Sequence, residues 1–181
     1  MMNKSIFAAI ALMASLAFGQ PAWTTGAKVT PVAVGQAPNS SAFGSQVYFA
    51  GQPTETDFAE YAKLGVKTVV NLRMPAEMEK VGFDEAATAK AAGIRYVNVP
   101  MTSAFPSEGE LAKIYAELEN SGGGKVLMHC ASSNRAGMVW AAYRGDKHGV
   151  PVEAAIAEGK AAGLKSPALE KTAREKLGSK P

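Results

Sequence analysis

The single thiol of this chain, Cys130, lies between His129 and a short polar loop that ends at Arg135. Residues 125–128 are mostly apolar and typical of a strand, and the residues after Arg135 are typical of a helix. Loop amides and a helix N-terminus together present positive potential to an anion. That potential favours a reactive thiolate, and a guanidinium can bind a tetrahedral oxyanion with two parallel hydrogen bonds. The pattern therefore predicts a nucleophilic cysteine in an anion-binding loop.

Each of these residues also has a simpler interpretation. A lone cysteine is often an inert, buried apolar residue, and an arginine at the start of a helix is often solvated. Ser132, Ser133 and Asn134 could form only a turn and a helix cap. We favour the anion-binding loop because all of these residues occur together between a strand and a helix, next to His129.

The first residues are typical of an export signal. Lys4 precedes an apolar run that ends in small residues at Gly19, which predicts a signal peptide over residues 1–19. The run is shorter than the ~20 apolar residues that a membrane span needs. We therefore expect a periplasmic or secreted protein with no stable membrane insertion after cleavage. With one cysteine in the chain, an internal disulfide is excluded.

Composition sets further bounds. The chain has 181 residues, 47% of them hydrophobic and 19% charged, which suits one globular domain. The net charge is +3 and no basic stripe stands out, so nucleic acid is not an expected partner. A metal site is not expected either, because His129 and His148 are the only histidines beside the one thiol. We expect no cofactor and a monomer.

From Gln46 onward, strand-like and helix-like segments alternate. Strand patterns at 47–50, 66–72, 96–99 and 125–128 are separated by helical patterns at 54–64, 84–92 and 107–120, and further helices follow over 135–148, from Pro151 and from Ser166. The alternation predicts an α/β fold with three layers and a mainly parallel central sheet of about four strands. We expect residues 20–45 to be a lead-in segment and 46–181 the catalytic domain. Ligands of such sheets gather at the carboxyl ends of strands, where Cys130 lies.

These residues resemble a known group of enzymes. His129-Cys130, the loop and Arg135 are similar to the signature of the cysteine-dependent phosphatases. Gly51-Gln52-Pro53 and the segment Val69–Arg73 are similar to the early strands of the beta-lactamase hydrolase-like phosphatases, a tyrosine-phosphatase-like family. The resemblance covers residues 46–164. It implies a tyrosine-phosphatase-like fold and a hydrolase that acts on a phosphorylated or other oxyanionic substrate.

The resemblance also implies roles for particular residues. Cys130 would attack phosphorus and form a cysteinyl-phosphate, Arg135 would bind the oxyanion, and His129 would support the thiolate from behind. The residues expected to bind the substrate around them are Ala131, Ser132, Ser133, Asn134, Ala136 and Gly137. Arg73 could line the entrance of the pocket, but we expect it to be solvated.

Two departures from the tyrosine-phosphatase pattern leave alternatives open. The loop between Cys130 and Arg135 is one residue shorter, as in the rhodanese sulfurtransferases, where the cysteine becomes a persulfide. The segment 100–106, where an aspartic acid would protonate the leaving group, contains none, and nearby Glu108 fits the first turn of a helix better. A sulfurtransferase that acts through Cys130 and a non-catalytic oxyanion-binding domain are therefore the alternatives to the phosphatase.

Overall fold

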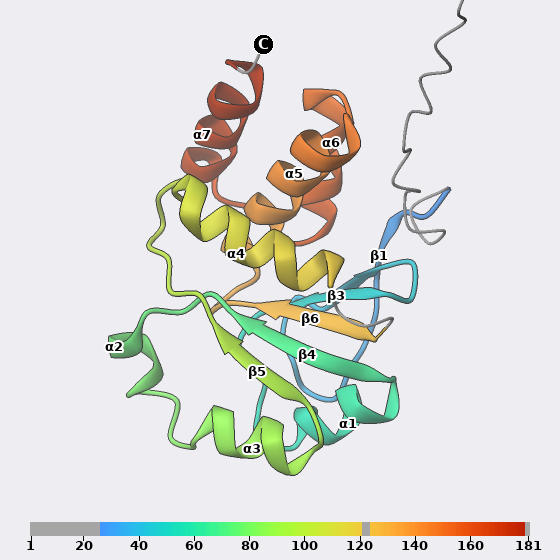
Figure 1. Ribbon diagram of the computed structural model, residues 1–181, viewed down its shortest axis with the longest axis vertical. Coiled ribbons are helices and arrows are strands. Elements are labelled where there is room, and N and C mark those ends of the chain that lie inside the picture. Colours follow the sequence, from blue (N-terminus) through green and yellow to red (C-terminus); the bar gives the residue numbers. More distant parts are fainter. Residues whose placement is uncertain (1–25, 121–123, 180–181) are drawn as a thin grey trace, which may run out of the picture.

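The alternating pattern folds into one sheet with helices on both faces (Figure 1). The computed structural model describes residues 26–120 and 124–179. The predicted signal peptide, residues 1–19, and residues 20–25 lie outside the described residues. None of the helices in the described ranges has the length and apolar character that crossing a bilayer requires.

Six strands make up the sheet within the described residues, in the order β1-β2-β3-β6-β4-β5. The neighbours β3, β6, β4 and β5 run parallel, whereas β1 and β2 pair antiparallel to each other and β2 to β3. The strands are β1 (Val29–Pro31), β2 (Ser41–Phe43), β3 (Val47–Ala50), β4 (Val66–Asn71), β5 (Arg95–Asn98) and β6 (Lys125–His129). The predicted parallel strands are thus confirmed.

The lead-in segment does more than the sequence indicated, because it supplies β1 and β2 and brings the sheet from about four expected strands to six. Each of these strands has only three residues, in a stretch rich in glycine and proline. So short a strand shows no period in the sequence. Its place in the sheet depends on pairing with β3.

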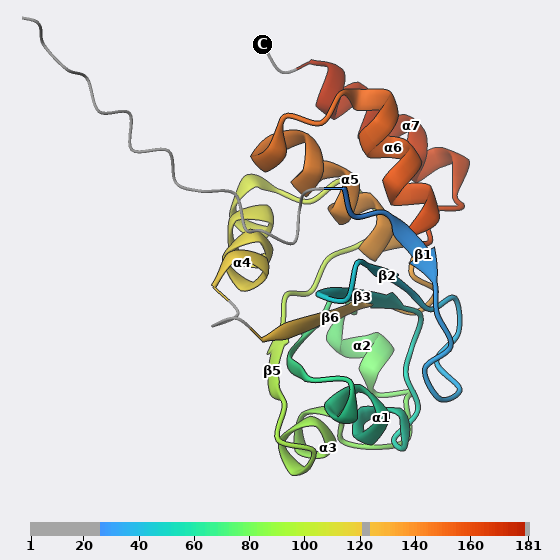
Figure 2. The same ribbon diagram turned by 90° about the vertical axis from the view of Figure 1, so that its right-hand side faces the viewer.

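Helices cover the two faces unequally, as both views show (Figures 1 and 2). On one side lie α4 to α7, and on the other lie α1 and α3, with the short α2 beyond the carboxyl ends of the strands. The helices are α1 (Asp57–Lys63), α2 (Pro75–Met78), α3 (Glu85–Ala91), α4 (Glu108–Glu119), α5 (Asn134–His148), α6 (Val152–Ala161) and α7 (Pro167–Gly178). The three-layer α/β architecture predicted from the sequence is confirmed.

Two hydrophobic clusters fill the space between the layers. On β6, Val126 and Met128 join the cluster under α4 to α7, and Leu127 joins the cluster over α1 and α3. This follows from the alternation of side chains along a strand. A central strand buried on both faces reads as a continuous apolar run, as β6 does. The core therefore fixes the end of β6, where Cys130 follows.

The helix starts are set by local hydrogen bonds. Ser107 caps α4 and accepts from the N–H of Glu110, whose carboxylate accepts from the N–H of Ser107, which confirms the predicted capping box. Ser166 caps α7 in the predicted place and accepts from the N–H of Leu169.

The helix that follows Cys130 packs unusually close to its neighbour. A Cβ added at Gly137 of α5 would lie 2.4 Å from the carbonyl oxygen of Gly159 on α6 and 2.5 Å from the N of Leu164. A Cβ added at Gly159 would in turn lie 2.6 Å from the carbonyl oxygen of Gly137. These are backbone atoms that cannot turn away, so two glycines let α5 and α6 meet and fix the helix that carries Arg135.

We expect Gly137→Ala to lower the free energy of unfolding by about 3 kcal/mol, because overpacking a rigid contact forces the backbone to shift. Gly109→Ala on α4 is the matched control, since its Cβ would meet nothing within 4 Å. Alanine has the better helix propensity, so this control should gain up to about 1 kcal/mol. Urea denaturation measures both values. Equal effects of the two substitutions would contradict the close contact of α5 and α6.

Candidate active site

Cys130 follows the central strand of the sheet. β6 lies between β3 and β4, and the N–H of Cys130 donates to the carbonyl of Ala50 at 3.4 Å. The side chain is 1% exposed. His129, the last residue of β6, pairs in register with Ala50 and with Asn71. The carboxyl end of the strand therefore places the thiol where the topology predicted a ligand site.

The loop after Cys130 is tied to the chain on two sides. On one side, Gly51 forms an antiparallel bridge with Ser132, and the N–H of Gln52 donates to the carbonyl of Ala131 at 3.1 Å. Ser133 adopts the left-handed conformation with φ of 68°. Its hydroxyl is buried and donates to the carbonyl of Ala162 at 2.7 Å.

Asn134 supplies the tie on the other side. Its Oδ1 accepts from the backbone N–H groups of Lys165 and Ser166, at 2.7 and 2.8 Å, and its Nδ2 donates to the hydroxyl of Ser132 at 3.1 Å. The loop is thus fastened to the segment that joins α6 to α7. This connection fixes the loop's conformation before any anion arrives.

The first turn of α5 presents its N–H groups at the loop. The N–H of Gly137 donates to the carbonyl of Ser133 at 2.8 Å, which is the first bond of the helix. The N–H groups of Asn134, Arg135 and Ala136 therefore have no acceptor within the helix. With the dipole of a 15-residue helix behind them, they form a favourable place for an anion. The N–H of Gly137 is already bonded to Ser133, and its Cα lies against α6. Gly137 therefore contributes to the packing of α5 rather than to anion binding.

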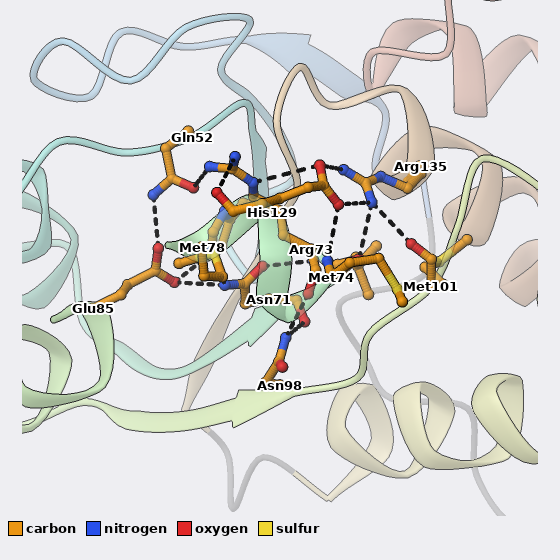
Figure 3. A network of polar contacts seen from close by, with 12 residues as sticks. Gln52, Asn71, Arg73, Met74, Met78, Glu85, Asn98, Met101, His129 and Arg135 are labelled. Carbon is orange, nitrogen blue, oxygen red and sulfur yellow. Dashed lines mark hydrogen bonds and ion pairs between the residues drawn. The ribbon is translucent and has the colours of Figure 1, made fainter. Parts of the chain in front are cut away.

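Arg135 is buried and held along one edge (Figure 3). Both of its terminal nitrogens donate to Glu77, at 2.8 and 2.7 Å, and Nη1 also donates to the carbonyls of Met101 at 2.8 Å and Leu72 at 3.3 Å. Burial opposes its charge, but hydrogen bonding to Glu77 and interaction with Cys130 outweigh it and raise the pKa of the guanidinium. Arg135 is therefore a fixed cation that interacts with the thiol of Cys130.

Glu77 is the carboxylate that orients this cation. The hydrogen bonds of Arg135 outweigh partial burial and, with the N–H of Met74, lower the pKa of Glu77 to about 2. Glu77 is therefore ionised at every physiological pH. It cannot supply a proton to a leaving group, and its role is to hold the guanidinium.

We expect the Glu77–Arg135 pair to give the fold a particular pH dependence. The pKa of Glu77 falls from 4.5 to about 2 on folding, so the pair stabilises the fold fully above pH 4.5 and loses that effect as pH falls toward 2. Denaturant titrations should show Glu77→Gln less stable than the parent chain by a constant amount above pH 4.5. The gap should close at lower pH. A gap that stays constant down to pH 2 would contradict the assignment.

A cavity of about 350 Å³ opens over the loop. From the loop it is lined by Ala131, Ser132, Asn134 and Arg135. Its remaining walls are Glu77, Ser103, Ser166, Ala168 and Leu169. Of the nine predicted site residues, these four line the cavity, and Cys130, which is 1% exposed, is not among the residues that line it. Ser133 and Ala136 are fully buried, Gly137 packs against α6, and His129 is fully buried at the end of β6.

Among the described residues, Glu77 is the one carboxylic acid that lines the cavity, and its lowered pKa keeps it ionised. Among the aspartates, Asp57 accepts from the N–H groups of Gln36 and Thr54, Asp84 caps α3, and Asp146 accepts from the hydroxyl of Tyr115. Glu108 is the exposed first residue of α4, as expected. In the segment 100–106, Ser103 is the residue that lines the cavity.

Arg73 was expected to be solvated, and this expectation is wrong. Its side chain is 11% exposed, and its guanidinium donates to the Oε1 of Gln52 and to the carbonyl of Glu77. Gln52 in turn donates to Glu85 at 2.7 Å. These contacts join segments that are far apart in the sequence, so neither the buried position of Arg73 nor the role of Glu77 has a local sequence signal. The acidic residue two positions after Pro75 was the available hint.

The described residues contain no group of three or more histidine, cysteine, aspartate or glutamate side chains able to hold a metal ion. What the arrangement offers is a thiol, a fixed guanidinium and a set of backbone N–H groups. Those are the parts of a site for a tetrahedral anion.

Comparison with known proteins agrees with this geometry. Residues 43–146 match the family described as Beta-lactamase hydrolase-like protein, phosphatase-like domain. Curated relatives include the Beta-lactamase hydrolase-like proteins of two strains of Xylella fastidiosa, Temecula1 and 9a5c, each 33% identical over 94 residues. The match covers 51% of this chain and 22% of each relative, so it spans about a fifth of their length.

Solved structures share the fold. P. aeruginosa TpbA superposes with a TM-score of 0.68 and 23% identity, over 87% of this chain and 93% of TpbA. The structure of TpbA (C132S) in complex with pTyr superposes with a TM-score of 0.60 and 22% identity, over 86% of this chain and 99% of that structure. Tk-PTP in its active form superposes with a TM-score of 0.61 and 21% identity, over 75% of this chain and 93% of Tk-PTP.

The family match runs from the last residue of β2 to residue 146 within α5, and it includes the thiol, its loop and the arginine that Glu77 holds. The chain therefore belongs to the family of phosphatase-like domains of the Beta-lactamase hydrolase-like proteins.

Proposed function

We propose that this chain is an exported phosphoric monoester hydrolase of the tyrosine-phosphatase type, with Cys130 as nucleophile and Arg135 as oxyanion ligand. The observation that carries the proposal is the guanidinium of Arg135, which Glu77 and two backbone carbonyls fix beside the thiol. The family's phosphatase-like character and the pTyr complex of TpbA support a phosphate ester as substrate. The export signal predicted from the sequence over residues 1–19 supports a periplasmic or secreted location.

The reaction would take two displacements. The Cys130 thiolate attacks phosphorus, so that a P–S bond forms, the P–O ester bond breaks and the leaving oxygen departs with the electron pair. Water then attacks the same phosphorus, the P–S bond breaks, and phosphate and the thiolate are released while the water proton passes to solvent. In both steps Arg135 and the N–H groups of the first turn of α5 stabilise the charge on the phosphoryl oxygens.

The intact mass of the protein tests this proposal. After an acid quench during turnover of an aryl phosphate, the phosphatase should carry one phosphoryl group, located on Cys130 by peptide mapping. Free phosphate should accumulate with repeated turnover. A chain that binds phosphate but neither gains mass nor releases phosphate would overturn the proposal and would identify an oxyanion-binding domain.

A second candidate function is sulfur transfer, which the short loop of four residues between Cys130 and Arg135 favours. Here the thiolate would attack the outer sulfur of thiosulfate, form a persulfide S–S bond and release sulfite. Cyanide would then take the outer sulfur and leave as thiocyanate. The same mass experiment with thiosulfate distinguishes the two, because a sulfur atom on Cys130 without phosphorylation by aryl phosphates would favour the sulfurtransferase.

We expect the phosphatase to depend steeply on its leaving group. Within residues 26–120 and 124–179, the one carboxylic acid that lines the cavity is Glu77, which is ionised, so we expect the leaving oxygen to depart without a carboxylic acid as proton donor. General acid catalysis contributes about 10²–10⁴-fold, so alkyl phosphates should turn over slower than nitrophenyl phosphate by at least that factor. A series of substituted phenyl phosphates measures the slope. A flat dependence of kcat on leaving-group acidity would show that a proton donor reaches the site.

A further inference from the structure

The short helix α2 brings Glu77 to the cavity with little packing to hold it there. It has four residues, none of which is buried, and neither hydrophobic cluster includes any of them. A helix of about one turn is not stable by itself. Its place beyond the carboxyl ends of the strands (Figure 1) must therefore come from polar contacts with its neighbours.

Two arginines bind Glu77 (Figure 3). Arg135 donates to its carboxylate with two nitrogens. Arg73 binds its backbone, because Nη2 donates to the carbonyl of Glu77 at 2.9 Å, and Nε of Arg73 lies 3.7 Å from Oε1. A weak bond from Nδ2 of Asn71 to Sδ of Met78, at 3.1 Å, adds to these contacts. Apart from the oxyanion ligand itself, Arg73 is therefore the charged group that holds α2 in place.

The backbone of Arg73 is attached to the sheet. Its N–H donates to Oδ1 of Asn71, the last residue of β4, at 2.8 Å. Its carbonyl accepts from Nδ2 of Asn98, the last residue of β5, at 3.1 Å. The guanidinium thus extends from a rigid part of the fold toward α2, which has little rigidity of its own.

The other partner of the guanidinium is held just as firmly. Nη1 of Arg73 donates to Oε1 of Gln52. The Nε2 of Gln52 in turn donates to Glu85 at 2.7 Å and to the carbonyl of Pro53 at 3.0 Å. Glu85 is itself buried at the start of α3. With both groups of the Gln52 amide bonded, Arg73 joins the segment after β3 to α2 through two nitrogens of one planar group.

From this geometry we propose that Arg73 is a positioning residue, which fixes α2 against the end of β4 so that Glu77 orients Arg135 toward an oxyanion. Arg73 is not among the residues that line the cavity over the loop, so its effect must pass through Glu77. The proposal rests on Arg135 as the oxyanion ligand of the proposed function, but it does not require that a phosphate ester be hydrolysed.

The affinity for inorganic phosphate, measured by calorimetric titration of the full chain, tests this role without any turnover. Arg73→Gln removes the charge and shortens the side chain, so that it cannot reach both partners. We expect Kd to rise about tenfold, which is less than the ~10²-fold that a displacement of about 1 Å can cost at a reacting group. The value of kcat/KM should fall by the same factor. An unchanged Kd would overturn the proposal.

The same titration separates positioning from a general loss of structure. A partly unfolded variant has fewer phosphate sites per chain, but each remaining site keeps the affinity of the parent. A positioning role instead raises Kd and leaves the number of sites unchanged. A lower number of sites with the parent Kd would therefore count against the proposal.

Two further variants test the route of the effect. Glu77→Ala leaves the carbonyl that Arg73 binds but removes the link to Arg135, so in this background Arg73→Gln should cause no further loss of affinity. A persisting loss would show that Arg73 acts on the anion directly, against the proposal. Arg73→Lys keeps the charge, but a single ammonium cannot replace both arms of the guanidinium, so it should also weaken phosphate binding. The parent Kd in the lysine variant would overturn the proposal even if the glutamine variant proved unstable.

Arg95→Gln is the matched control. Arg95 also bonds a glutamate on another element, Glu117 of α4, but it is the first residue of β5 and so lies at the opposite end of the strand from the site. Its substitution removes the same charge and should leave Kd unchanged. An equal rise of Kd in both variants would indicate a general effect of lost positive charge and would contradict the role of Arg73.

The outcomes for the two proposals differ. If Kd responds as expected while no phosphate is released from any aryl phosphate, the phosphatase proposal fails and the role of Arg73 stands. If phosphate is released and Arg73→Gln keeps the parent Kd, the reverse holds. A parent chain that binds no inorganic phosphate would overturn the role given to Arg73.

Discussion

Replacement of Cys130 by serine is expected to lower phosphate release by at least ~10⁴-fold while the site keeps its affinity for inorganic phosphate. A serine hydroxyl is not ionised at neutral pH, whereas the thiol lies beside a fixed guanidinium and the first turn of α5. Those anion-binding groups are unchanged by the substitution. This one variant should therefore lose phosphate release while it keeps its affinity for phosphate.

Two measurements check this expectation. Steady-state release of phosphate from an aryl phosphate gives the loss of turnover, and calorimetric titration with phosphate gives the affinity. Cys130 is packed in the core, so a thermal melt should accompany both, with the serine variant still folded at the assay temperature. Residual turnover within tenfold of the parent would mean that Cys130 is not the nucleophile.

The second large effect is expected for Arg135→Lys, which should lower kcat/KM by about 10²–10³-fold. Lysine keeps the positive charge and can still pair with Glu77, so the ion pair that stabilises the fold persists. It cannot place two parallel N–H groups on an oxyanion while it also satisfies Glu77 and the carbonyls of Met101 and Leu72. The loss is thus one of geometry rather than of charge.

The same helix provides a matched control. Arg144 of α5 is also buried and also binds a glutamate with two nitrogens, since its Nε and Nη2 donate to Glu158 at 2.8 and 3.2 Å. It lies more than two turns beyond the loop. Arg144→Lys should therefore leave kcat/KM unchanged, although it removes the same kind of contact. An equal loss of activity in both variants would indicate a general effect on α5.

Local sequence patterns were sufficient to predict the strand, the loop and the helix around Cys130. The apolar run of β6, the capping box of Ser107 and the cap at Ser166 all depend on residues that are close in sequence. Local chemistry also predicted Arg135 as the oxyanion ligand, a role that phosphate turnover of its variants would test. Such features form before the rest of the fold is specified, so a sequence alone can carry them.

The carboxylates of the site could not be predicted in the same way. Glu77 is 58 residues from Arg135 and Glu85 is 44 residues from His129, and each looks like an ordinary acidic residue near a helix start. Only the sheet brings β4, the start of α3 and the end of β6 together. Arg73 was misread for the same reason, because its partners Gln52 and Glu77 lie on other segments.

The hydrogen bonds that hold the loop after Cys130 determine how long a piece of the chain must be to form the site. Ser133 holds its left-handed conformation through the carbonyl of Ala162, and Asn134 is held by the N–H groups of Lys165 and Ser166. The family match ends at residue 146, before all three of these partners. A fragment that ends at residue 146 would keep the thiol and the arginine, but it would lose the hydrogen-bond partners that shape the loop between them. The smallest autonomous unit is consequently larger than the stretch shared with relatives.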